Sequence, residues 1–193
     1  MTSYLFLADG FEEIEALATV DILRRAGIDV KTVSIKETHG VKGAHGVTVN
    51  ADLVYDEMAY APAEWLILPG GMPGASNLAA HERLCDKLHE QNLKGGKIAA
   101  ICASSGVVLG PLGIMRGKAG VCYPGFETLM QGCNVQSTLV AVDDNVVTGS
   151  SPAAAMPFAL AIVEITKGAE VADSVAQGML LREDSKKSEY YFG

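Results

Sequence analysis

The sequence predicts a doubly wound, flavodoxin-like α/β fold, a mainly parallel sheet flanked by helices on both faces. Short, continuously apolar runs alternate with longer segments of helical periodicity, and such runs are typical of strands buried on both faces. The strands are expected at residues 4–8, 30–35, 47–49, 65–68, 97–101, 139–142 and 146–148. The helices are expected at residues 12–26, 76–92, from 103 onward, and 151–167.

Turn and cap residues mark several of these boundaries. Gly27 follows the first predicted helix, and Pro69 begins a proline–glycine loop after an apolar run. Asp144 begins the Asp-Asn pair between the last two predicted strands, which predicts a hairpin. Ser151 is expected to cap the last helix, because Pro152 suits the first helical position.

The size and composition describe an ordinary globular protein. The chain has 193 residues, of which 49% are hydrophobic and 20% are charged, and this is enough for about one domain with its own core. We expect a single domain over residues 1–193, with residues 182–193 either docked or loose. The net charge of −8 argues against duplex DNA or an anionic membrane as the main partner.

Cysteine usage and apolar runs bear on the compartment. The four cysteines include no C-x-x-C pair and are too few for a disulfide scaffold. The N-terminal apolar run is short and lacks a preceding basic residue, so it does not indicate a signal peptide. The longest later apolar run, residues 153–163, falls short of the ~20 residues that span a bilayer. We expect a soluble, cytoplasmic protein with reduced thiols and neither a membrane nor a specific nucleic-acid partner.

A cysteine directly after a predicted strand is the strongest candidate for a functional residue. In a doubly wound sheet, ligands bind beyond the carboxyl ends of the strands. Cys102 follows the strand 97–101 and precedes a helix of small residues, as in a nucleophile elbow, although the G-x-S-x-G pattern is absent. A helix N-terminus favours a thiolate. The alternative, of about equal weight, is a buried cysteine that acts as a small hydrophobe.

Two further features accompany this cysteine. The glycines after Pro69 could present N–H groups to an anion or simply form a tight loop, but the loop matches neither a phosphate loop nor a dinucleotide fingerprint. Glu12 and Glu13 are explained by the dipole of the predicted helix. Glu15 lies deeper among apolar residues, so it is either a partly buried acid that keeps its proton or a solvated surface acid.

Taken together, these segments resemble the ThiJ/PfpI superfamily, and within it the branch of the Parkinson disease protein seven (DJ-one) and the bacterial YajL proteins. The resemblance covers nearly the whole chain. Each matching piece is short, and it is their order and spacing that make the match specific. The matching segments are residues 10–15, 20–27, 69–71, 74–78, 100–103 and 158–164.

The resemblance implies roles for four residues. Cys102 matches the reactive, oxidation-prone cysteine of the family, and Glu15 matches the acid that donates a hydrogen bond to its sulfur and keeps it as a thiolate. Gly71 and Ala103 match the residues whose backbone N–H groups face an oxyanion beside the sulfur. The family also implies a homodimer, with the helix 12–26 near the interface.

One position departs from the family pattern. Tyr123 stands before a proline where many members have a histidine, so no cysteine–histidine pair is available there and a protease function loses support. Tyr123 is expected either to position a substrate by its hydroxyl or to pack. His45 falls where the branch often has a basic residue near the dimer interface, which makes it a candidate for an anion contact.

Metal and cofactor sites are not expected. His81, Cys85 and His89 are spaced four residues apart on a predicted helix, so the two histidines are ~12 Å apart along its axis. One zinc ion with ligands at ~2 Å cannot take all three. The pattern indicates a half-buried helix stripe.

The resemblance implies a glyoxalase III or deglycase-like enzyme that uses a cysteine nucleophile. Its substrates would be small reactive carbonyl compounds, 2-oxoaldehydes such as methylglyoxal, or their adducts with proteins (glycated protein) and nucleotides. The alternative is a non-enzymatic sensor of oxidative stress or a redox-regulated chaperone that uses the oxidisable Cys102. A thiamine-biosynthesis role, from older family labelling, has no support here, because the site has neither a phosphate loop nor a basic cluster.

Overall fold

The computed structural model describes residues 1–58, 62–181 and 190–192. Eight strands form one sheet in the order β12-β10-β11-β7-β6-β1-β2-β5, and of its strand pairs only β10–β11 is antiparallel. The strands are β1 (Ser3–Leu7), β2 (Val30–Ser34), β5 (Leu53–Val54), β6 (Trp65–Leu68), β7 (Lys97–Ile101), β10 (Val140–Asp143), β11 (Val146–Gly149) and β12 (Tyr190–Phe192). The predicted doubly wound α/β fold, with its β10–β11 hairpin, is confirmed.

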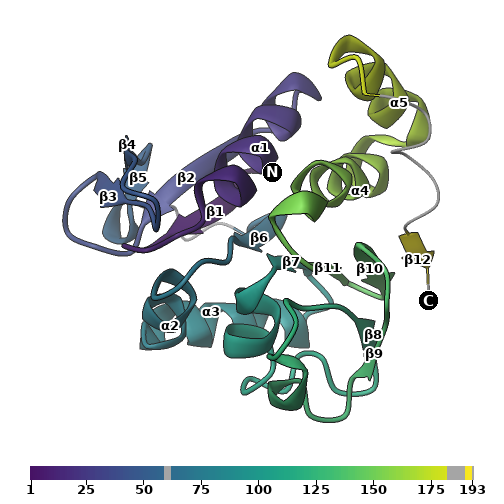
Figure 1. Cartoon of the computed structure of the whole chain (residues 1–193). Helices are drawn as coiled ribbons and strands as arrows, with labels where there is room; N and C mark the ends of the chain where they lie inside the picture. The colour runs from purple at the N-terminus through teal and green to yellow at the C-terminus, as the bar shows by residue number, and fades with distance from the viewer. Residues whose placement is uncertain (59–61, 182–189, 193) are drawn as a thin grey trace.

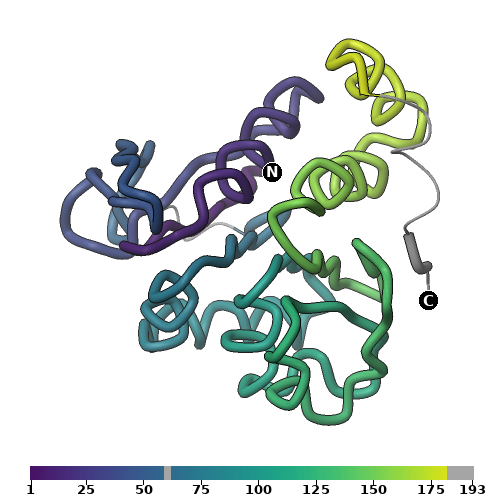
Figure 2. The backbone as a smooth tube through the Cα atoms, in the orientation of Figure 1, coloured from purple at the N-terminus to yellow at the C-terminus, as the bar shows by residue number. Residues whose placement is uncertain are grey.

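Helices cover both faces of this sheet (Figure 1). On one face, α1 and α4 pack against each other and α5 packs on α4. On the other face lie α2, α3 and a π-helix, and the two groups are separated by the sheet in the backbone trace of Figure 2. The bounds are α1 (Glu13–Arg25), α2 (Gly74–Ala79), α3 (Glu82–Leu93), the π-helix (Ser105–Leu109), α4 (Ala155–Lys167) and α5 (Ala169–Gly178).

The side chains of the central strands alternate between two hydrophobic cores. Leu5 and Leu7 of β1 belong to the core under α1 and α4. Tyr4 and Phe6 of the same strand belong to the core under α3. Because successive strand residues point to opposite faces, a continuously apolar strand fills both cores at once. This explains why the central strands read as unbroken apolar runs.

Short elements surround the main sheet. β3 (Gly40–Lys42) pairs with β4 (Thr48–Asn50), and β8 (Ala119–Gly120) pairs with β9 (Asn134–Val135). The strand expected at residues 47–49 therefore exists, shifted by one residue, but lies outside the main sheet. Three 3-10 helices complete the described elements: η1 (Tyr55–Glu57), η3 (Glu127–Leu129) and η4 (Pro152–Ala154).

Two helix predictions need correction. The helix expected over 76–92 is two helices, α2 and α3, because the His81 side chain caps α3 by accepting the Leu84 N–H at 3.1 Å. His81 therefore precedes the helix, and of the predicted stripe only Cys85 and His89 lie on it. The Ser151 side chain forms no cap hydrogen bond, and a short 3-10 helix precedes α4. Helix α5 was not predicted.

The C-terminal segment is described only in part. Residues 182–189 and 193 of the predicted tail lie outside the described residues. Tyr190–Phe192 pairs in parallel with β10 at the edge of the sheet. In the described part of the chain, no helix is both long and apolar enough to cross a membrane.

Candidate functional site

The loops after three neighbouring strands meet around Cys102. β7 lies between β6 and β11 in the sheet, and Cys102 follows β7 directly. The backbone N–H of Cys102 donates to the Gly149 carbonyl of β11 at 2.8 Å. On the other side, the Ser104 hydroxyl donates to the Pro69 carbonyl at 2.6 Å. Hydrogen bonds to both neighbouring strand ends therefore hold the cysteine turn in place.

The backbone at Cys102 has the conformation expected of an elbow. Its φ is +62°, in the left-handed region that residues with a side chain rarely adopt. Helical residues follow at once and lead into the π-helix Ser105–Leu109. Such a conformation costs about 1–3 kcal/mol and persists only where the surroundings impose it. The predicted sharp strand-to-helix turn is confirmed, although the Cys102 residue is only 7% exposed.

Glu15 is a fully buried acid in the first turn of α1, beside the sulfur. Its Oε2 accepts the Gly70 N–H at 2.7 Å, and its side chain interacts with the Cys102 thiol. Its Oε1 is buried and has no hydrogen-bond partner among the described residues. Burial raises the pKa of Glu15 to about 7, against the hydrogen bonds from Cys102 and Gly70, which lower it. Of the two alternatives left open for Glu15, the structure shows the buried acid and not the solvated surface acid.

The thiol itself is less acidic than predicted. Burial and the negative charge of Glu15 raise the pKa of Cys102 to about 12, whereas the backbone N–H groups of Ala103 and Gly71 lower it. The prediction of a lowered thiol pKa is therefore wrong, because desolvation outweighs the donors at the helix start. Burial raises both pKa values, so near neutral pH the pair keeps at least one proton.

The predicted oxyanion-binding residues lie at the sulfur, since the N–H groups of both Gly71 and Ala103 reach it. Gly71 has a φ of +89°, and a Cβ there would collide with the backbone of Glu12. A Cβ on Gly70 would lie 2.6 Å from the Cys102 Cβ and 2.7 Å from the Glu15 Oε2. Both glycines are therefore required for the acid, the thiol and the donors to come this close.

Tyr123 lies beside the nucleophile through its backbone. Its N–H donates to the Cys102 carbonyl at 3.2 Å, and the residue is 44% exposed. The backbone of Tyr123 therefore adjoins the cysteine turn from the side of residues 121–124. Its role in positioning a substrate stays a prediction.

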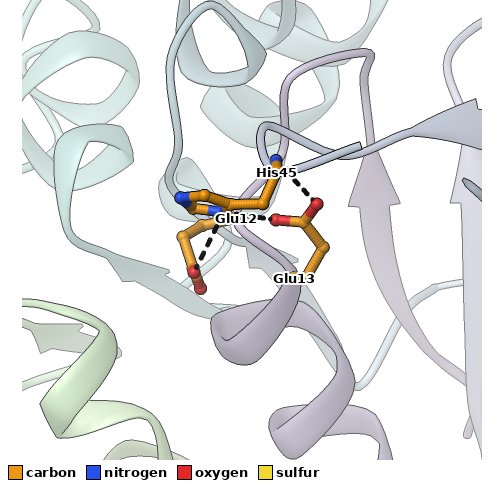
Figure 3. A group of neighbouring side chains, drawn as sticks. All are labelled: Glu12, Glu13 and His45. Atoms are coloured by element: carbon orange, nitrogen blue, oxygen red, sulfur yellow. Dashed lines mark hydrogen bonds and ion pairs between the residues drawn. The ribbon is translucent and has the colours of Figure 1, made fainter. Parts of the chain in front are cut away.

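His45 contacts two carboxylates at the start of α1 (Figure 3). Its Nδ1 lies 2.8 Å from the Glu13 Oε2 and 3.8 Å from the Glu12 Oε1, and its backbone N–H donates to Glu13. The hydrogen bond that the imidazole donates to Glu13 raises the pKa of His45. Burial opposes ionisation of Glu13, but hydrogen bonds from His45 and the backbone still lower its pKa. The imidazole thus pairs with acids already present, which does not favour its predicted contact with a substrate anion.

The same three side chains bear on metal binding. Glu12, Glu13 and His45 offer ligand atoms within 4.8 Å of one another, the arrangement among the described residues that could hold an ion. Glu12 also caps α1, because its Oε2 accepts the Glu15 N–H at 2.7 Å. Glu12 thus caps the helix and Glu13 pairs with His45, so a structural role at the start of α1 accounts for the group without a metal ion.

Sequence reasoning missed two residues that build the site. Gly70 donates to Glu15 and leaves room for it, and Ser104 fastens the elbow to the loop after β6. A Gly-Gly pair after one strand and a Ser-Ser pair after the nucleophile were the available signals. Neither signal shows which glycine donates to Glu15 or which serine donates to Pro69.

The fold and the site define the class: an α/β protein with a cysteine elbow, a buried acid and two backbone donors. The model of the DJ-1/PfpI family matches residues 1–165, so this chain belongs to the DJ-1/PfpI family. The chain is similar to the "Glutathione-independent glyoxalase DJR-1.2" of Caenorhabditis elegans, with 33% identity over 88% of this chain and 90% of that protein. It is also similar to a solved structure, "Toxoplasma gondii DJ-1, oxidized", with 35% identity, a TM-score of 0.88, and coverage of 93% of this chain and 97% of that one.

Some relatives are much longer than this chain. "Protein DJ-1 homolog A" of Arabidopsis thaliana is 33% identical over 91% of this chain, which spans only 45% of that protein. The chain thus spans about half the length, or less, of the first curated relatives that it matches.

Proposed function

We propose that this protein is a glyoxalase that converts 2-oxoaldehydes such as methylglyoxal to 2-hydroxy acids, with Cys102 as the nucleophile. The observation that carries the proposal is the Glu15–Cys102 pair, in which a buried acid with a pKa of about 7 adjoins a thiol faced by two backbone donors. A general base with a pKa near the working pH is the most effective. The name of the Caenorhabditis elegans relative supports this reaction class.

In the first step, the Cys102 sulfur adds to the aldehyde carbon while ionised Glu15 takes the thiol proton. Glu15 suits the role of this base because its pKa of about 7 is close to neutral pH. The aldehyde oxygen becomes an oxyanion, and the N–H groups of Gly71 and Ala103 stabilise it. Glu15 then returns the proton to this oxygen, which gives a neutral hemithioacetal.

In the second step, Glu15 takes the hydrogen of the former aldehyde carbon as a proton and delivers it to the neighbouring ketone carbon. The hydroxyl proton moves from the first oxygen to the second. The aldehyde carbon is thereby oxidised by two electrons and the ketone carbon is reduced by two, so the residues named require no external oxidant. The product is a thioester on Cys102, and water hydrolyses it to the 2-hydroxy acid and the free thiol.

The same chemistry extends to early adducts of 2-oxoaldehydes. In an adduct with an amine, the former aldehyde carbon carries a hydroxyl and a nitrogen. Breaking its bond to nitrogen regenerates the carbonyl group that Cys102 attacks. Deglycase activity on proteins or nucleotides is thus a possible extension of the same proposal, limited by how much of the adduct fits beside a nucleophile that is 7% exposed.

A redox-sensor function is the second candidate, and one observation favours it. The N–H groups of Gly71 and Ala103 would also hold the oxygens of an oxidised Cys102, and a protonated Glu15 could donate to a third position. In this alternative the protein senses oxidative stress, or acts as a redox-regulated chaperone, without turnover. From the family resemblance we further propose a cytoplasmic homodimer with α1 near its interface.

The deciding experiment compares formation of D-lactate from methylglyoxal by the reduced wild-type protein, Cys102→Ser and Cys85→Ser. Cys85 is a matched control, because it is half-buried on α3 and donates to the Ala79 carbonyl. We expect kcat/KM to fall by about 10³-fold or more in Cys102→Ser, and to stay within about twofold in Cys85→Ser. Full activity of Cys102→Ser would refute the mechanism. Inactive wild-type protein would instead favour the redox sensor.

A further inference from the structure

A polar pocket of about 380 Å³ lies beside the cysteine elbow. Its walls come from three segments that are far apart in sequence, residues 121–124 with 127, residues 135–138, and residues 150–151. We call it the hydroxyl pocket, for the side chains described below. The reaction proposed above uses none of its lining residues.

The backbone of Cys102 is bonded to one residue in the wall of the hydroxyl pocket and to a chain neighbour of another, on the flank away from Gly71. The Gly149 carbonyl that accepts the Cys102 N–H directly precedes Ser150 in the pocket wall. The Cys102 carbonyl accepts the N–H of Tyr123, a second wall residue. The oxyanion donor Gly71 follows β6, on the opposite side of β7 from β11. Cys102 itself does not line the pocket, so a carbonyl compound must extend beyond the sulfur to reach it.

The three walls are bonded to one another. The Ser150 N–H donates to the Leu139 carbonyl at 2.9 Å, and the Gln136 N–H donates to the Gly120 carbonyl at 2.9 Å. The Val121 N–H donates to the Thr148 hydroxyl at 2.9 Å. These bonds join the segments to β11 and β8. The pocket is therefore largely formed before a ligand arrives, as is usual for small-molecule sites.

The lining is rich in neutral hydrogen-bonding groups. Hydroxyl and amide side chains contribute from all three walls: Tyr123, Gln136, Ser137, Thr138, Ser150 and Ser151. Glu127 is the one charged lining residue, and no lysine or arginine lines the pocket within the described part of the chain. Without a cation, the pocket does not suit a phosphate or a carboxylate. Its chemistry matches a neutral ligand that carries several hydroxyl groups.

The size of the pocket points the same way. A water molecule takes up about 30 Å³ in the liquid, so the pocket has room for roughly a dozen water-sized groups. A three-carbon 2-oxoaldehyde such as methylglyoxal occupies less than half of that space. It also carries no hydroxyl group that could pair with the hydroxyl and amide side chains of the lining, which alternate with the apolar residues Val121, Pro124 and Val135. Both facts favour a longer substrate whose tail is hydroxylated.

We infer that the hydroxyl pocket binds the polyhydroxylated tail of six-carbon 2-oxoaldehydes, the dicarbonyl compounds that sugars yield, while their aldehyde carbon reacts at Cys102. This inference rests on the proposed function and names its substrate class. The reaction is the one balanced above, with the six-carbon 2-hydroxy acid as its product. The tail adds hydrogen bonds in the pocket and takes no part in bond making.

The test compares 3-deoxyglucosone, a six-carbon 2-oxoaldehyde with a hydroxylated tail, with methylglyoxal. For each protein the measured quantity is the ratio of the two kcat/KM values, in which the hydration of each aldehyde cancels between variants. Ser137→Leu fills the pocket from an exposed loop position, so it is not expected to disturb folding. Thr128→Leu is the matched control, an exposed hydroxyl residue nearby that does not line the pocket. We expect the ratio to fall about tenfold in Ser137→Leu and to stay unchanged in Thr128→Leu.

A second readout does not depend on turnover. Each aldehyde protects Cys102 from iodoacetamide by forming a hemithioacetal, and peptide mass spectrometry gives the half-protecting concentration. In Ser137→Leu we expect this concentration to rise about tenfold for 3-deoxyglucosone relative to methylglyoxal. Equal ratios in all three proteins by both readouts would overturn the hydroxyl pocket and leave the glyoxalase proposal standing. A shifted protection ratio without turnover of either aldehyde would support the pocket and refute the glyoxalase.

Discussion

Cys102 and Cys122 are almost equally buried, at 7% and 6% exposed, yet their surroundings differ in kind. Burial raises the pKa of both thiols, to about 12 for Cys102 and about 11 for Cys122. Cys102 has a left-handed backbone, an acid that can take its proton and two backbone donors at its sulfur. The charges near Cys122, those of Glu127 and Cys133, only oppose its ionisation. Burial and thiol pKa therefore do not identify the nucleophile, whereas the oriented acid and donors do.

The largest effect is expected from removing the acid of this pair. Glu15→Gln keeps an oxygen for the Gly70 N–H but cannot accept a proton, so kcat/KM for methylglyoxal should fall by about 10³-fold. In the wild-type protein kcat/KM should rise with pH through about 7 as Glu15 ionises. The matched control is Glu13→Gln, whose carboxylate faces His45 instead. Wild-type activity in Glu15→Gln would show that the neighbouring acid is not what distinguishes Cys102 from Cys122.

A smaller effect concerns stability, because a buried acid destabilises the fold when it ionises. The pKa of Glu15 is raised from 4.5 to about 7, so between these values the folded protein binds more protons than the unfolded chain. The contribution of Glu15 to the free energy of unfolding is therefore fully present below pH 4.5. It falls by about 3 kcal/mol as the pH rises to about 7. Urea unfolding of the wild-type protein and Glu15→Gln at pH 4.5, 6 and 7.5 measures it. We expect the variant to gain stability relative to wild type with rising pH. A constant difference would contradict the raised pKa.

The smallest effect sharpens the comparison directly. Under limiting peroxide at neutral pH, Cys102 should be oxidised about tenfold faster than Cys122, because the Gly71 and Ala103 donors stabilise its oxidised sulfur. Peptide mass spectrometry after iodoacetamide blocking gives both rates in one sample. Glu13→Gln should leave the ratio unchanged, since it alters neither thiol environment. Equal rates would show that the donors do not bias oxidation.

The features that depend on short-range sequence patterns could be predicted from the sequence. The apolar runs predicted the central strands, because a strand buried on both faces has no polar side. Cys102 between a strand and small residues predicted the elbow, whereas the apolar neighbours of Glu15 left open whether it is a buried or a surface acid. Sequence periodicity gave wrong helix boundaries where a side chain caps a helix by a hydrogen bond to its backbone. His81 divides a predicted helix by capping α3, which periodicity cannot show.

The remaining features depend on how segments meet in space. The pKa of Cys102 was predicted in the wrong direction because its main cause is desolvation by the packed fold. The hydroxyl pocket joins three segments whose sequences carry no shared motif. His45 was predicted to contact a substrate anion. In the structure its loop lies against the start of α1, where Glu12 and Glu13 are its acidic partners.

The geometry of the site depends on the absence of a Cβ atom at Gly70. Most of the chain's glycines with positive φ could gain a methyl group at the cost of backbone strain, and Gly27 and Gly95 have nothing within 4 Å of that position. At residue 70 the same methyl group would be a wedge driven between the Cys102 Cβ and the Glu15 carboxylate. Any side chain there would permanently occupy the space between the acid and the thiol and so inactivate the site. The acid and the thiol can work as one unit only while residue 70 remains a glycine.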